Sequence, residues 1–174
     1  LHRLRRIGRA MPGLNILLVR DDAENLRAAL MLAMTQRALD GEARIFLQME
    51  AVRLIAPPLA AQRDEEHRRA GFPTLAALAD EALADGVAII ACQSGLALYA
   101  MKAADLDPRI ETGGLLSFMA AIGPADRLLS LSKSERDFVH PAFRAGFLVA
   151  LDRDQFIAQR RRHRAGLAAA DGET

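Results

Sequence analysis

The chain has 174 residues, of which 51% are hydrophobic, with 23 basic and 22 acidic side chains. This length suits a single domain, because globular domains commonly hold roughly 100 to 200 residues. The formal charge of +1 gives no general attraction for nucleic acid or an anionic membrane, so we expect neither as a partner. The single cysteine excludes an internal disulfide framework and a CxxC motif, and it suits a reducing compartment. We therefore expect a cytoplasmic protein.

The first ten residues, LHRLRRIGRA, hold four arginines and no acidic side chain. Met11 precedes the first apolar run of the chain. We expect residues 1–13 to be a basic N-terminal extension outside the fold, which comes from an upstream start or a cloning remnant rather than from a targeting segment.

Strand and helix patterns alternate from residue 14 onward. The run LNILLVR at 14–20 is typical of a buried strand. Over residues 21–41 apolar side chains recur every three and four residues, which predicts an amphipathic helix that ends at Gly41. The run ARIFLQM at 43–49 predicts a second strand. Because this order implies a parallel crossover between the two strands, the predicted class is α/β.

The alternation continues to about residue 131. A short helix is predicted at 50–56, and Pro57 and Pro58 end it; the charged segment that follows reads as a loop or a ragged helix. The remaining predicted elements are a helix at 75–84 capped by Thr74 and ended by Gly86, a strand at 87–92, helices at 94–102 and 115–122, and a strand at 126–131.

The last part of the chain, residues 132–174, is predicted to be a C-terminal extension of uncertain structure. FLVAL at 147–151 is a strand candidate, and residues 154–168 are a helix candidate. The arginine-rich run at 160–164 is expected to be a solvated face rather than a nucleic-acid or lipid contact, because no aromatic side chains alternate with the arginines.

Loops that follow the predicted strands are the expected position of a site. Parallel α/β sheets bind ligands outside the carboxyl ends of their strands, where residues 20–25, 48–52 and 92–96 would meet. The glycines of TGG at 112–114 are expected to form a turn before the next helix. The candidate pocket residues are Arg20, Asp21, Gln48, Gln93, Ser94, Gly95, Gly113 and Gly114.

Cys92 ends the third predicted strand and precedes a predicted helix. The N–H groups and dipole at the start of such a helix would favour a thiolate and activate it as a nucleophile. Free cysteine is also among the most buried residue types and behaves as a small hydrophobic side chain. From the residues alone, both interpretations of Cys92 remain open.

Other candidate chemistry has simpler interpretations. The acidic run DDAE at 21–24 is explained by helix capping, with Asp21 or Asp22 as the N-cap, rather than by metal binding or acid-base catalysis. The four histidines are far apart in the sequence and lack metal-ligand spacing, so we expect no metal site. Phosphate-loop and dinucleotide motifs are absent from the sequence, and we expect no cofactor.

The succession NILLVRDDAENLRAALMLAMTQRALDGEARIFLQM, followed by GVAIIACQSGLALYAM, resembles the DsrE/DsrF-like family over about residues 14–131. The matching features are a strand followed by acidic helix-start residues, an Ala/Leu-rich helix that ends in Gly, a second strand, and a cysteine that ends the strand before GL. The resemblance implies a three-layer α/β/α sandwich with a mainly parallel sheet of about five strands, and homo-oligomers that are commonly trimers or hexamers.

In some members of this family the cysteine at this strand end carries a persulfide, and that position corresponds to Cys92. The resemblance therefore implies a sulfur-relay or thiol-redox protein with a sulfur donor or acceptor protein as its partner. We discount a peroxidase, because no proton-accepting shell is found around Cys92 in the sequence. The alternative is a non-catalytic oligomeric module of the same fold that binds a small ligand or another protein.

Overall fold

The computed structural model describes residues 11–132. Its strands are β1 (Leu14–Leu18), β2 (Ala43–Leu47), β3 (Ala88–Cys92), β4 (Glu111–Gly113) and β5 (Arg127–Leu131). Its α-helices are α1 (Ala23–Ala38), α2 (Asp64–Arg69), α3 (Leu75–Ala84), α4 (Gln93–Leu98) and α5 (Leu115–Ala120), and its 3₁₀ helices are η1 (Met49–Ile55) and η2 (Ala103–Asp105).

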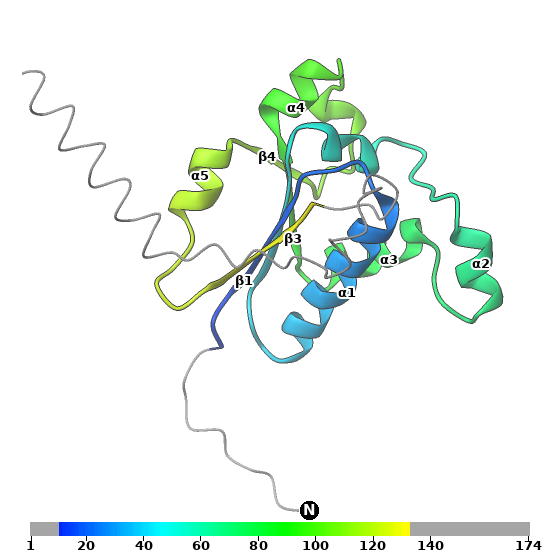
Figure 1. Cartoon of the computed structure of the whole chain (residues 1–174), viewed down its shortest axis with the longest axis horizontal. Helices are drawn as coiled ribbons and strands as arrows, with labels where there is room; N and C mark the ends of the chain where they lie inside the picture. The colour runs from blue at the N-terminus through cyan, green and yellow to red at the C-terminus, as the bar shows by residue number, and fades with distance from the viewer. Residues whose placement is uncertain (1–10, 133–174) are drawn as a thin grey trace, which may run out of the picture.

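The five strands form one sheet in the order β4-β3-β2-β1-β5, and all neighbouring strands are parallel. Figure 1 shows α1 and α3 on one face of this sheet and α5 on the opposite face. The predicted α/β class, the layering and the number of strands are therefore confirmed. Within residues 11–132, no helix is long and apolar enough to cross a membrane. The elements predicted at 147–151 and 154–168, and the basic run at 160–164, lie outside the described residues.

The two faces of the sheet have different partners. Phe46 stacks against Phe118 of α5 with ring centroids 4.9 Å apart. The Arg44 guanidinium lies over the same Phe118 ring, and Arg44 Nε donates a hydrogen bond to Asn15 Oδ1. Because successive strand residues point to opposite faces, the alternate side chains form the core under α1 and α3; they are Ile16, Leu18, Ile45 and Leu47, all fully buried.

The ends of α1 follow from local side-chain and backbone chemistry. Asp22 is the N-cap, and its carboxylate accepts hydrogen bonds from the N–H groups of Glu24 and Asn25. At the other end the prediction is corrected by one residue. Asp40, not Gly41, adopts the left-handed conformation with φ of 61°, and the Gly41 N–H bonds back to the Gln36 carbonyl. This motif ends the helix at Ala38.

Two further predictions are wrong in detail. Residues 111–113, predicted as part of a connecting segment and turn, form the edge strand β4, because they pair with residues 90–92 of β3. The helix predicted at 94–102 ends at Leu98, since Ala100 adopts a left-handed φ of 51° and the Met101 N–H bonds to the Leu96 carbonyl. Thr74 and Gly86 cap and end α3 as predicted.

Candidate functional site

Cys92 is the last residue of β3 and lies at the carboxyl edge of the sheet. It pairs with Gly113 of β4 and is also the N-cap residue of α4. Its side chain accepts no capping hydrogen bond, and α4 has only six residues. Activation of the Cys92 thiol by this helix stays a prediction from the sequence. The residue is buried, with 5% of its surface exposed.

The helix that follows Cys92 rests on η1. Gly95 is buried, and a Cβ at this position would lie 2.5 Å from the Met49 carbonyl oxygen and 3.0 Å from Val52 Cγ1. Only glycine allows the backbones of α4 and η1 to approach this closely. Met49 itself has a positive φ of 49°, a conformation that non-glycine residues rarely adopt. The loops after β2 and β3 are thus fitted tightly together beside the thiol.

Two ion pairs join the loop after β1 to η1. Arg20 Nη1 lies 3.3 Å from Glu50 Oε1, and Arg53 Nη1 lies 2.8 Å from Asp21 Oδ2. The Arg53 guanidinium also lies 5.6 Å from the ring centroid of Tyr99, the C-cap residue of α4. Side chains from the segments that follow β1, β2 and β3 therefore meet along η1.

Metal binding has no support in the described residues. Between residues 11 and 132, no group of three or more His, Cys, Asp or Glu side chains is arranged to hold an ion. The acidic residues of DDAE have other partners: Asp21 pairs with Arg53, Asp22 caps α1, and Glu24 Oε2 lies 2.9 Å from His67 Nε2. Capping and ion pairing account for this run.

The family model of the DsrE/DsrF-like family matches residues 15–131. The chain belongs to this family. Among solved structures, it is similar to the ychN protein from E. coli, with a TM-score of 0.53 and 19% identity, and to MTH1491, a protein of unknown function from Methanobacterium thermoautotrophicum, with a TM-score of 0.51 and 13% identity. Each alignment covers 70% of this chain and 100% of the other. The comparison with curated proteins found no match.

The predicted pocket residues of this DsrE/DsrF-like chain fall into two groups along the carboxyl edge. The first surrounds Cys92: Gln93 and Ser94 are exposed beside it, Gly95 is buried against η1, Gly113 pairs with it, and Gly114 is the N-cap of α5. The second lies toward β1 and η1. Gln48 donates its N–H to the Leu18 carbonyl, and Arg20 and Asp21 form the ion pairs described above.

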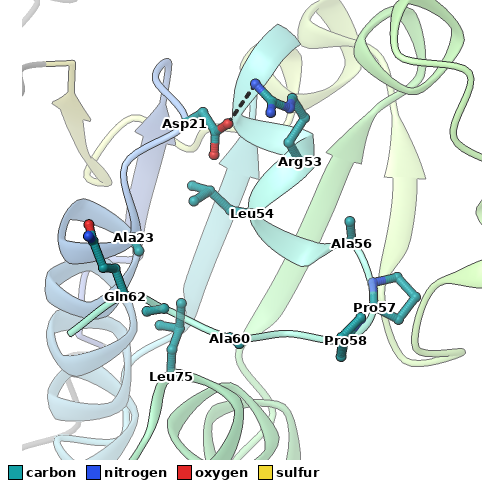
Figure 2. Close-up of a pocket in the computed structure, with 11 residues that line it drawn as sticks. Asp21, Ala23, Arg53, Leu54, Ala56, Pro57, Pro58, Ala60, Gln62 and Leu75 are labelled. Atoms are coloured by element: carbon teal, nitrogen blue, oxygen red, sulfur yellow. Dashed lines mark ion pairs between the residues drawn. The ribbon is translucent and has the colours of Figure 1, made fainter. Parts of the chain in front are cut away.

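A cavity of about 390 Å³ lies on the β1 side of η1. Figure 2 shows it between Asp21 and Arg53 at one end and the loop of Pro57, Pro58 and Ala60 at the other. Cys92 is not among its lining residues, and of the predicted pocket residues only Asp21 lines it. Sequence reasoning missed Arg53 and the proline loop, since no motif links them to residue 21. The one sequence feature that pointed to Arg53 is its spacing of three residues from Glu50, which places both side chains on the same short helix.

Proposed function

We propose that this DsrE-like protein is a sulfur carrier in which Cys92 accepts a sulfane sulfur and passes it to an acceptor thiol. The observation that carries the proposal is the position of Cys92, which ends a central parallel strand at the edge where α/β sheets bind their ligands. The family resemblance supports it, because some members carry a persulfide on the cysteine at this strand end.

The chemistry needs one thiolate and no cofactor. The Cys92 sulfur attacks the outer sulfur of a donor persulfide, a new S–S bond forms on Cys92, and the donor leaves as a thiolate. In the second step an acceptor thiolate attacks the outer sulfur on Cys92, which returns to its original thiolate. Each step exchanges one S–S bond for another, so no external oxidant or reductant is consumed.

Access to the sulfur depends on the short helix α4. Cys92 is 5% exposed, whereas Gln93 and Ser94, which follow it directly, are exposed. A six-residue helix that rests mainly on η1 is a small cooperative unit, and local opening of such units costs less than global unfolding. We infer that displacement of α4 admits the donor and that its return shields the loaded sulfur from water.

Loading of Cys92 by a small-molecule persulfide tests the proposal. We expect intact-protein mass spectrometry to show a gain of one sulfur atom, with the modified peptide containing Cys92. Because the chain has one cysteine, Cys92→Ser should show no gain under the same conditions. An unchanged mass in the parent protein, or an equal gain in Cys92→Ser, would contradict the proposal.

The burial of Cys92, together with a cavity that does not include it, favours one alternative, a non-catalytic oligomeric binding module of the same fold. The two functions differ in the accessibility of the thiol. For the carrier, we expect iodoacetamide to alkylate Cys92 in the native protein much faster than global unfolding exposes it. Alkylation that proceeds only at the unfolding rate would favour the module instead.

We further propose that the protein is a homo-oligomer, a trimer or hexamer, that works in the cytoplasm with a donor or acceptor protein. Exposed large apolar side chains support a contact surface: Leu98 on α4 and Leu116 on α5 are 61% and 74% exposed. Light scattering at working concentration that finds only a monomer would contradict the oligomer.

A further inference from the structure

The cavity beside η1 has the size of a small-molecule site. Its volume of about 390 Å³ falls within the range of roughly 300 to 1,000 Å³ that is typical of ligand pockets. It opens at the carboxyl edge of the sheet, next to the loop that follows β1. Cys92 does not line it, so a ligand bound there does not occupy the position of the thiol.

Apolar side chains form one part of the wall of this cavity, and the polar side chains of Asp21, Arg53 and Gln62 form another. Leu54 of η1 and Leu75 of α3 are 8% and 1% exposed, and both belong to the hydrophobic core of the domain. The rings of Pro57 and Pro58 form the side that Figure 2 shows opposite Asp21. Proline rings and core side chains lose little conformational freedom when a ligand binds, so this part of the wall suits a compact apolar group.

The end of the cavity near α1 carries an oriented guanidinium. Arg53 is held between the Asp21 carboxylate, 2.8 Å away, and the ring of Tyr99, yet its side chain remains 54% exposed. A guanidinium has five N–H donors in a planar fork, so the bond to Asp21 through one terminal nitrogen still allows a second carboxylate to bind. Arg53 is thus positioned to donate two parallel N–H hydrogen bonds to the two oxygens of a carboxylate.

Local electrostatics favour an anion over a cation at this end. Ala23, the first residue of the 16-residue helix α1, lines the cavity, so the positive end of the helix dipole lies beside it. The negative charge of Asp21 is already paired with Arg53, and that of Asp22 is directed at the N–H groups of Glu24 and Asn25. A bound carboxylate would share Arg53 with Asp21, whereas a cation would have to compete with Arg53 for Asp21.

We propose that this cavity binds a small organic monocarboxylate, with its aliphatic or aromatic body between Leu54, Leu75 and the proline loop and its carboxylate on Arg53. Isothermal titration of the full chain with 3-phenylpropionate and with hexanoate tests this. We expect saturable binding, and we expect the neutral 3-phenylpropanamide to bind at least about tenfold more weakly, since it cannot form the charged pair with Arg53.

Two variants and one control locate the binding. Arg53→Met should weaken binding of 3-phenylpropionate by about tenfold or more, and Ala60→Phe, which fills the cavity, should abolish it. Arg63→Met removes an exposed arginine that does not line the cavity and should leave the affinity unchanged. Circular dichroism checks that each variant is folded.

Three results would overturn the proposal. They are an absence of saturable binding up to about 10 mM, binding that survives both Arg53→Met and Ala60→Phe, and inorganic phosphate binding as tightly as the monocarboxylates. Because Cys92→Ser should leave this binding intact, failure of this proposal is distinguishable from failure of the sulfur-carrier function.

Discussion

Arg27→Met is expected to lower the free energy of unfolding by about 3 to 5 kcal/mol, which is the usual cost of removing one partner from a buried ion pair. The Arg27 side chain is 7% exposed, and its Nη2 lies 2.6 Å from Asp64 Oδ1. Its Nη1 donates to the Pro73 carbonyl, and its Nε lies 3.8 Å from Glu24 Oε1. The substitution would leave the Asp64 carboxylate without the buried guanidinium that pairs with it. Urea unfolding at neutral pH measures the loss.

Arg63→Met is the matched control for this prediction. Arg63 pairs with Glu66 on the surface of α2, where both side chains are at least half exposed. Exposed pairs contribute little because water screens them and their side chains lose entropy when they pair. We expect no measurable change in the urea midpoint. Equal losses in the two variants would contradict the role assigned to burial.

The same ion pair should make the free energy of unfolding depend on pH in the acid range. Burial of the Asp64 carboxylate opposes its ionised form, but hydrogen bonds from Ala61 and Leu75 N–H groups and from Arg27 outweigh it and lower the pKa of Asp64 below 3.8. A lowered pKa in the folded state contributes stability above the unfolded value, and this contribution disappears as the pH falls through the folded value. In Asp64→Asn, the free energy of unfolding should therefore fall less steeply as the pH decreases below about 3.8.

Gly95→Ala is expected to destabilise the protein by about 1 to 3 kcal/mol, the usual cost of overpacking a tightly fitted site. The added Cβ would lie 2.5 Å from the Met49 carbonyl oxygen, a backbone atom that a change of side-chain rotamer cannot move. We expect α4 to shift away from η1 and expose Cys92. Thermal unfolding measures the loss, and a faster reaction of Cys92 with iodoacetamide measures the exposure.

Gly114→Ala provides the matched control for Gly95→Ala. A Cβ at Gly114 meets no atom within 4 Å, and no positive φ is required there. Because Gly114 is an N-cap residue, we expect Gly114→Ala to lower the free energy of unfolding by less than about 1 kcal/mol. Unchanged alkylation in both variants would contradict the proposal that the contact between α4 and η1 controls access to the thiol.

Periodicity and turn residues predicted most of the fold. The apolar spacing in α1 identified Leu26, Ala29, Leu30 and Ala33, which are fully buried, and Met34, which is partly buried against the core. Acidic and hydroxyl caps marked the starts of α1 and α3, because their side chains satisfy the free N–H groups there. The strand before Cys92 was a continuous apolar run, as expected for a strand covered on both faces.

The parts that sequence reasoning missed depend on contacts between distant residues. β4 is the short, polar segment Glu-Thr-Gly, and it becomes a strand through pairing with β3 rather than through an apolar pattern. No sequence pattern singled out Arg27, whose buried guanidinium pairs with Asp64, 37 residues further along. The cavity likewise requires residues 21, 53 and 75 to meet, and no local pattern predicts that meeting.

The burial of Cys92 is what a carrier function must overcome, so transfer of sulfur through this residue is the central claim. The most direct measurement loads the protein with a small-molecule persulfide, removes the donor, adds an acceptor thiol and follows both species by mass spectrometry. We predict that Cys92 loses its extra sulfur atom as the acceptor gains one, and that Cys92→Ser transfers none. Sulfur that never loads onto Cys92, or that stays there in the presence of the acceptor, would contradict the account.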